Sequence, residues 1–392
     1  MMKLNRLAGF GVLFLLPLLA SAAPTPVEIV QSIPEGTNLA LPELRRAKDV
    51  WPLMIDGAKT RIDIAQMYIS SAKGRALEPV IEALEAAGNR GVKIRFLLWV
   101  GMKDNDEDSL ARIRAIPNLT LAIYDISKVT GGIHHAKYWV VDGKEIFVGS
   151  QNFDWLSLEE IHETGVLIDS KPLADRLETV FAHDWGFATT GVWGDESVPA
   201  SSTAPSDVEL VSSPERLNPK GVSVALAKLL SLIGNAKASI KIALLDYSTS
   251  AYSEKKPWTE IDDALRAAAK RGVKVELLLS HWNTAKSEIG SIRSLAVVPG
   301  IEVKISFVPD LPSGHVPYSR VIHTKHMIVD GKTYWVGTSN WSRGYFYDTR
   351  DIEIVMNRPE LARTGTKIFE AVWTAPYTEA LDPNREYPAP IK

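Results

Sequence analysis

The pattern of apolar and polar residues along the chain occurs twice. Residues 58–65 alternate between apolar and polar side chains after a turn, which is typical of a strand, and residues 236–243 repeat the pattern. A helix-like run precedes each of these strands, at residues 47–55 and 222–233. An internal repeat of this length predicts that the chain folds as two similar halves.

Each half continues with a second helix and a second strand. Residues 78–87 carry apolar side chains at helical spacing and lead into an apolar run at 90–98; residues 261–269 and 271–279 are the second copy. The glycine after each helix tolerates the left-handed cap conformation, and the Val/Ile/Leu run that follows is typical of a buried strand. Strands that alternate with helices predict an α/β architecture, with the two halves related by a pseudo-twofold.

The length of the chain and one biased segment suggest where the halves meet. The 392 residues exceed the usual size of a single domain. Residues 196–207 are rich in Pro, Ser, Thr and Ala, which is the composition of a linker. We therefore expect an N-terminal half at 23–195 and a C-terminal half at 208–392.

Residues 1–22 have the pattern of a signal peptide. Lys3 and Arg6 form a basic start, residues 7–19 are largely apolar, and residues 20–22 are small, as a cleavage site requires. The alternative is a membrane anchor, but the apolar run is shorter than the roughly 20 residues that a span needs. We expect cleavage, no membrane span in the mature chain, and a periplasmic or secreted protein.

Composition and charge narrow the classes of function. The hydrophobic fraction of 45% and charged fraction of 23% are those of a globular protein. A formal net charge of −3 argues against a protein that coats duplex DNA, although a local basic cleft remains compatible with it. The chain contains no cysteine, which excludes disulfides, a thiol nucleophile and thiolate-zinc sites.

Each half also carries the same cluster of polar residues. A His-x-Lys pair is followed by an Asp after four residues, and then, after six more, by Gly-Ser-x-Asn in the first half and Gly-Thr-x-Asn in the second. These positions are His135, Lys137, Asp142 and Asn152 in the first copy, and His323, Lys325, Asp330 and Asn340 in the second.

The spacing within the cluster has a physical meaning. Side chains two apart on a strand point to the same face, Asp-Gly makes a tight turn, and the return strand brings the asparagine back beside the His-Lys pair. Lysine and asparagine donate hydrogen bonds that suit phosphate oxygens, and an imidazole serves as nucleophile or proton donor. A single His-x-Lys is usually a solvated strand, but two copies in register with a repeat point to a site. Two buried ammonium groups would repel a cation, so we expect no metal and no cofactor.

With both copies in view, the sequence resembles the phospholipase D superfamily, whose signature is this duplicated motif. Thr338 replaces the usual serine in the second copy. The resemblance covers nearly all of the mature chain. It implies two α/β halves, each a mixed sheet flanked by helices, that form one site at their interface, and it implies a covalent phosphohistidine intermediate.

Two segments that begin at the motif asparagines resemble a narrower group within this superfamily. Residues 152–158 and 340–346 are similar to the phospholipase D-like single-strand 5′ exonucleases of animals and the poxvirus envelope phospholipases. Glu163 lies eleven residues after Asn152, where that group has an acid that orients a histidine. In the second half Asp351 holds this position and Glu353 lies two residues further on, so either is a candidate partner.

The resemblance implies a role for each of these residues. His135 attacks phosphorus and His323 protonates the leaving oxygen, an order taken from the family because the motif itself is symmetric. Glu163 serves His323 across the interface, and Asp351 or Glu353 serves His135. The phosphate oxygens are held by Lys137, Lys325, Asn152 and Asn340. Asp142 and Asp330 are expected to brace the hairpin turn.

Four aromatic residues lie just beyond the two motifs, and their role divides the candidate substrates. These residues are Trp155, Trp341, Tyr345 and Phe346. Their side chains either cap the hydrophobic core, stack on the bases of a single nucleic-acid strand, or line a pocket for a lipid. We expect a monomeric phosphodiesterase that favours single-stranded nucleic acid, with phospholipid head groups as the alternative. A phosphatidyl transferase and an inactive binding protein are less favoured.

Overall fold

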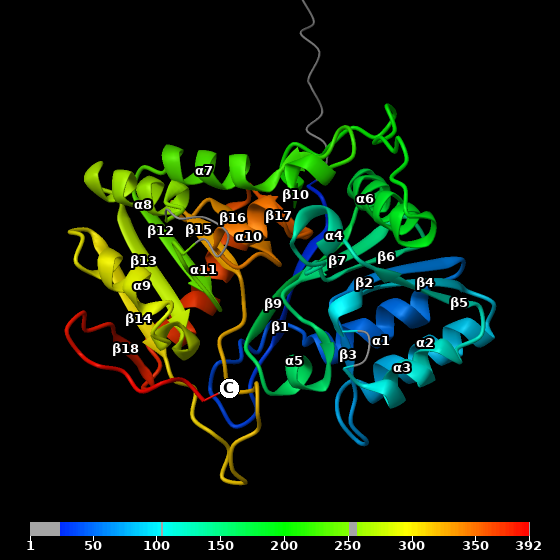
Figure 1. The fold of residues 1–392 in the computed structure, drawn as a ribbon, viewed down its shortest axis with the longest axis horizontal. Helices are drawn as coiled ribbons and strands as arrows, with labels where there is room; N and C mark the ends of the chain where they lie inside the picture. Colours follow the sequence, from blue (N-terminus) through cyan, green and yellow to red (C-terminus); the bar gives the residue numbers. More distant parts are fainter. Residues whose placement is uncertain (1–23, 103–104, 251–256, 392) are drawn as a thin grey trace, which may run out of the picture.

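The computed structural model describes residues 24–102, 105–250 and 257–391. The predicted signal peptide at 1–22 lies outside the described residues. Figure 1 shows two sheets side by side, the first on the right with the N-terminal half of the chain and the second on the left with the C-terminal half.

The first sheet is mixed and, within the described residues, has seven strands. Their order is β1-β9-β7-β6-β2-β4-β5. Strands β2, β4 and β5 run parallel, and β6, β7, β9 and β1 continue the sheet in antiparallel steps. The bounds are β1 Val27–Ser32, β2 Arg61–Gln66, β4 Lys93–Trp99, β5 Leu119–Tyr124, β6 Tyr138–Val141, β7 Glu145–Gly149 and β9 Glu163–Asp169.

The second sheet repeats this order and adds a strand at each edge. Over the described part of the chain its order is β11-β10-β17-β16-β15-β12-β13-β14-β18. The bounds are β10 Val208–Ser213, β11 Ser223–Val224, β12 Ser239–Leu244, β13 Lys274–Ser280, β14 Ile301–Ser306, β15 His326–Val329, β16 Thr333–Gly337, β17 Asp351–Met356 and β18 Thr378–Ala380. A small separate pair joins β3 (Ile69–Ser70) to β8 (Phe153–Asp154).

Helices pack on both faces of each sheet. Their bounds are α1 Ala47–Gly57, α2 Glu78–Asn89, α3 Glu107–Arg114, α4 Ser127–Thr130, α5 Trp155–Glu159, α6 Lys171–Thr190, α7 Ala225–Asn235, α8 Glu260–Lys270, α9 Ile289–Ala296, α10 Arg343–Tyr347 and α11 Pro359–Trp373. Apolar residues of α1, α2 and α3 form the outer core of the first half, and those of α7, α8 and α9 form that of the second. Apolar residues of α6 and α11 join one cluster shared by both halves.

The predicted α/β class with two similar halves is confirmed. Helix α1 begins at the predicted Ala47, and α2 begins at the predicted Glu78. In the second half α8 extends the predicted helix by one residue at each end, from Glu260 to Lys270. Helix α7 begins at Ala225, three residues later than the pattern suggested. The segment 196–207 lies in the irregular stretch between α6 and β10.

Two buried ion pairs fasten the halves to each other. Arg350, which precedes β17, donates to Asp184 of α6 at 2.9 Å, and both side chains are fully buried. Arg320 donates to Glu160 at 3.0 Å and is almost as deeply buried. Breaking a buried pair by removing one partner leaves an uncompensated charge, so these contacts fix how the halves are oriented. None of the helices in the described ranges combines the length and apolar character needed to cross a membrane.

Candidate active site

Each motif histidine lies in a segment whose backbone is hydrogen-bonded to the opposite half. The backbone N–H of His135 donates to the carbonyl of Arg350 at 3.0 Å, and that of His323 donates to the carbonyl of His162 at 2.9 Å. Both histidines precede their hairpins, because β6 begins only at Tyr138 and β15 at His326. The sequence predicted that each His-x-Lys pair lies on a strand. In the structure each pair lies just before the strand, in a segment whose backbone is hydrogen-bonded to the other half.

Each histidine meets a carboxylate from the opposite half. Nδ1 of His323 lies 2.8 Å from Oε2 of Glu163, and Nδ1 of His135 lies 2.8 Å from Oδ1 of Asp351. Glu353 follows Asp351 by two residues on β17, but its carboxylate accepts a hydrogen bond from Ser339. In each half, therefore, the acid that meets a histidine is the one eleven residues after the motif asparagine.

Burial controls the protonation of this group. It lowers the pKa of His135 well below its ordinary value, with the nearby charges of Lys137 and Lys325 acting in the same direction. It lowers the pKa of His323 to about 4, although the carboxylate of Glu163 opposes this change. It raises the pKa of Asp351 to about 7. Neutral imidazoles that present Nε2 to a cavity are therefore favoured when the cavity holds no anion.

The two motif lysines are buried beside the histidines and are not among the residues that line the cavity. The ammonium of Lys325 donates to the carbonyl of His323 at 2.6 Å, and that of Lys137 donates to the carbonyl of His135. Burial lowers the pKa of Lys137 to about 7 and that of Lys325 well below its usual range. A bound phosphodiester anion would favour the charged form of both amines.

The motif aspartates have matching structural contacts. Asp142 accepts hydrogen bonds from the backbone N–H groups of residues 59–61, at 2.8 to 2.9 Å. Asp330 makes the same contacts with residues 237–239. Each aspartate thus ties its hairpin turn to the start of the neighbouring strand, β2 or β12, and stands outside the cavity lining.

Both histidines and both motif asparagines open onto one cavity of about 500 Å³ at the interface of the halves. The carboxamide of Asn340 donates to the hydroxyl of Tyr345 at 3.0 Å, and the backbone N–H of Asn152 donates to Ser157 at 3.2 Å. One imidazole from each half therefore faces the same volume, which suits attack and protonation on opposite sides of a phosphorus atom.

The structure divides the four predicted aromatic residues into two pairs. Trp155 and Tyr345 line the cavity, and the ring of Tyr345 packs edge-on against His135 with centroids 5.0 Å apart. Trp341 is fully buried and Phe346 is 3% exposed, and both belong to the core of the second half. Neither side chain lines this cavity, and Trp341 occupies the repeat position of the equally buried core residue Phe153.

Three aromatic residues of the cavity wall were missed by the sequence analysis. Tyr68 follows β2, Trp282 follows β13, and Tyr318 lies in the loop that leads to β15. The first two stand just beyond the carboxyl ends of strands that run parallel to their neighbours, where α/β folds place their ligands, and this signal was available in the sequence. Tyr318 is 62% exposed and has a φ of 61°, a conformation common at ligand-contacting loops.

Within residues 24–102, 105–250 and 257–391, no group of three or more His, Asp or Glu side chains is arranged to hold a metal ion. The ionisable groups that line the cavity include the two imidazoles and the carboxyl group of Asp154, and two amines are buried beside the imidazoles. In their protonated forms the imidazoles and amines can stabilise the negative charge of a phosphodiester.

Comparisons with known proteins agree with this geometry. The family model described as "Cardiolipin synthase, PLD-like domain" matches residues 53–185 and 229–373. A probable phospholipase D of Caenorhabditis elegans is 31% identical over 402 residues, which cover 90% of this chain and 70% of the worm protein. The rat 5'-3' exonuclease PLD3 is 31% identical over 406 residues, which cover 92% of this chain and 81% of the rat protein.

A solved structure shares the fold at low sequence identity. The phosphatidylserine synthase of Haemophilus influenzae matches with a TM-score of 0.61 and 12% identity, over 85% of each chain. This likeness supports the arrangement of two similar halves and carries no information on the substrate.

Proposed function

The chain belongs to the phospholipase D superfamily of phosphodiesterases, and we propose that it hydrolyses single-stranded nucleic acid through a phosphohistidine. The observation that carries the proposal is the pair of histidines on one cavity, each bonded through Nδ1 to a carboxylate of the opposite half. A hydrogen bond at Nδ1 leaves Nε2 of each ring available for chemistry.

The proposed reaction has two displacements at phosphorus. Nε2 of His135 forms a bond to phosphorus while the ester oxygen leaves and takes a proton from His323. His323 then removes a proton from water, and the resulting hydroxide displaces His135 from phosphorus. The carboxylate of Asp351 stabilises the positive charge on the phosphorylated His135 ring, and Glu163 does so for protonated His323.

The cavity wall supports a nucleic-acid substrate. Trp155, Trp282, Tyr318 and Tyr345 all contribute aromatic surface to it, and a base stacked on an aromatic side chain gains roughly 1–3 kcal/mol. The guanidinium of Arg75 lies 4.1 Å from the ring centroid of Trp155 and holds that ring in place. The related rat protein carries the name of an exonuclease.

A second candidate substrate is a phospholipid. Ile161, Leu245 and Val321 form a small apolar cluster that lines the same cavity, and an acyl chain or glycerol backbone could pack against it. The related worm protein carries the name of a phospholipase D. The same two-histidine chemistry would then cleave the bond to the head group.

A substrate panel tests the proposal. Purified protein in excess EDTA is expected to shorten single-stranded oligonucleotides and to leave micellar phosphatidylcholine largely intact. Tyr318→Ala should weaken cleavage of the oligonucleotide about 5- to 150-fold, because 1–3 kcal/mol of stacking is removed. Tyr318→Phe is the matched control, since it keeps the ring and should retain activity. Cleavage of lipid but of no oligonucleotide would reject the nucleic-acid assignment, and a need for a divalent ion would reject the metal-free mechanism.

The pH dependence should follow Lys137. Its charged form supplies positive charge beside the cavity that binds the phosphodiester anion, and burial lowers its pKa to about 7. Since a lysine loses its charge above its pKa, we expect kcat/KM for a small phosphodiester to fall as the pH rises above about 7. Below that pH it should rise with pH, because burial raises the pKa of Asp351 to about 7 and the mechanism needs the carboxylate form. The measurement is a profile of kcat/KM against pH; activity that holds steady up to pH values near the ordinary lysine pKa of about 10.4 would contradict the assignment.

A further inference from the structure

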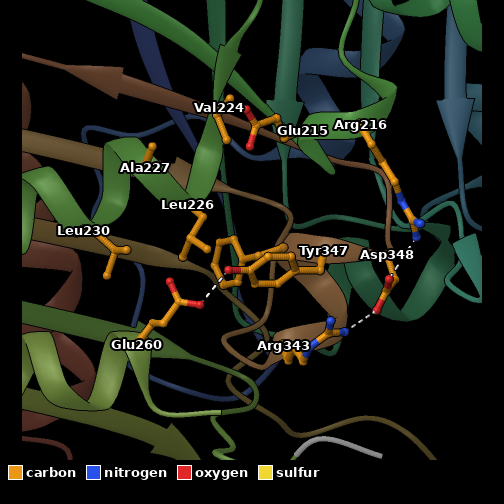
Figure 2. A pocket seen from close by; sticks show the side chains of 11 residues that line it. Glu215, Arg216, Val224, Leu226, Ala227, Leu230, Glu260, Arg343, Tyr347 and Asp348 are labelled. Atoms are coloured by element: carbon orange, nitrogen blue, oxygen red, sulfur yellow. Dashed lines mark hydrogen bonds and ion pairs between the residues drawn. The ribbon is translucent and has the colours of Figure 1, made fainter. Parts of the chain in front are cut away.

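Two further hollows lie near the active cavity and share lining residues with it or with each other. A second hollow of about 590 Å³ shares Tyr345 with the active cavity. A third hollow of about 580 Å³ shares Arg216, Arg343 and Asp348 with the second. Figure 2 shows the third hollow, with these three side chains at one end and apolar residues of α7 at the other. The shared residues place the second hollow next to both the active cavity and the third hollow.

Where the second and third hollows meet, one carboxylate is shared by two guanidinium groups. Arg216 and Arg343 each lie 3.0 Å from Asp348, one on each carboxylate oxygen. The side chain of Arg216 is half exposed, and that of Arg343 is 22% exposed. These three side chains together carry a net charge of +1, and the carboxylate of Glu215 also lines the third hollow. Guanidinium groups are well matched to phosphate oxygens.

The second hollow has room for a backbone rather than for a large side chain. A Cβ atom added at Gly131 or Gly344, both of which line it, would meet nothing within 4 Å. Three small hydroxyl residues, Ser250, Ser342 and Thr349, also line it. The hydroxyl groups of these residues can hydrogen-bond to the oxygens of a sugar-phosphate chain that follows this hollow.

The third hollow differs in character. Its wall is made of Val224, Leu226, Leu230 and Phe346, and the hydroxyl of Tyr347 is held by Glu260 at 2.6 Å. The carboxylate of Glu260 disfavours a phosphate at this end, while the apolar wall and the Tyr347 ring suit the face of a base. A strand that leaves the catalytic histidines would therefore meet the hydroxyl groups of the second hollow first. It would then reach Arg216 and Arg343, and after them the apolar wall of the third hollow.

We propose that a single strand cleaved between the two histidines continues past Tyr345 into these hollows, with a later phosphate at Arg216 and Arg343 and the next base against the apolar wall. The inference rests on the proposed function and deepens it, because it assigns binding of a polymer to residues outside the duplicated motif. It follows that strand length, and not only the cleaved bond, determines how well a substrate is used.

The test compares a long single-stranded oligonucleotide with a dinucleotide. In the double variant Arg216→Ala/Arg343→Ala, the ratio of kcat/KM for the long substrate to that for the dinucleotide should fall about tenfold, since the variant cannot make the charged hydrogen bonds to the later phosphate. The salt dependence of the long substrate should also become shallower, by about 0.7 in log–log slope for each phosphate that the variant no longer binds. Arg112→Ala on α3, whose guanidinium pairs with Glu85, removes a comparable charge elsewhere and should leave the ratio unchanged.

A variant with the opposite effect excludes general damage to the fold. Asp348→Asn keeps the side-chain shape and removes the negative charge shared by the two arginines, so it should raise kcat/KM for the long substrate several-fold and steepen its salt dependence. Suppose that the wild type cleaves oligonucleotides but that the ratio of kcat/KM for the long substrate to that for the dinucleotide is the same in the wild type and in all of these variants. This result would overturn the inference and leave the proposed function standing. If the wild type cleaves no oligonucleotide at all, both are overturned.

Discussion

Alanine at either His135 or His323 will lower the turnover of a small phosphodiester by at least about 10²- to 10⁴-fold, the usual cost of losing one general acid or base. His135→Ala removes the nucleophile, and His323→Ala removes the proton donor and the base that activates water. The readout is kcat for a soluble chromogenic diester, a substrate that depends little on the aromatic wall and reports on the histidine pair itself.

The combination of the two substitutions is as informative as each alone. Because the histidines act in one reaction sequence, the double variant should be scarcely slower than the worse single variant. His315→Ala is the matched control, since His315 pairs with Asp310 at the protein surface and lies outside the active cavity. Near-wild-type turnover in either single variant would mean that the chemistry does not use both histidines.

The repeat explains why so much of the fold was predictable. Apolar periodicity in residues 47–98 and its copy in 222–279 specify local elements, and local elements depend mainly on nearby sequence. The edge strands β11 and β18 have no such signal, because they are two and three residues long and exist only through pairing with distant segments. Loop residues such as Tyr318 join the cavity only through the packing of the two halves.

The aromatic residues show where the pattern was misread. Trp341 follows the motif asparagine, and Phe153 follows it in the first copy. An aromatic side chain at the same place in both copies is typical of a shared core position, and both are fully buried. Trp155 has no aromatic counterpart, since Arg343 stands at its place in the second copy, and it is Trp155 that lines the cavity. At this position the difference between the copies, rather than their agreement, marks the side chain that lines the cavity.

The acid that serves His135 could not be chosen from sequence. Asp351 and Glu353 both project from β17 toward the same side, because side chains two apart on a strand share a face. What separates them is the register between the halves: the backbone of Arg350 pairs with the segment around His135, which brings the next residue to the imidazole. Glu353 instead lies against Ser339 in its own half.

Asp351→Asn should reduce turnover far more than Glu353→Gln. The amide of asparagine cannot stabilise the positive charge of a phosphorylated imidazole, and it can hold the ring in the wrong tautomer; the corresponding change in a Ser-His-Asp triad costs roughly 10⁴-fold. Burial, with the nearby charge of Asp351 adding to it, raises the pKa of Glu353 well above its usual value. This shift favours the protonated form of Glu353, which glutamine resembles in shape and charge.

The same pair of variants separates catalysis from stability. Both substitutions keep the volume of the side chain and an oxygen that can accept a hydrogen bond, so both variants should show only small shifts in denaturant midpoint. Only Asp351→Asn should combine that shift with a large loss of kcat, because Nδ1 of His135 is hydrogen-bonded to Asp351, whereas Glu353 is hydrogen-bonded to Ser339. Equal losses of kcat in the two variants would mean that β17 supports the site as a whole and that no single carboxylate orients the nucleophile.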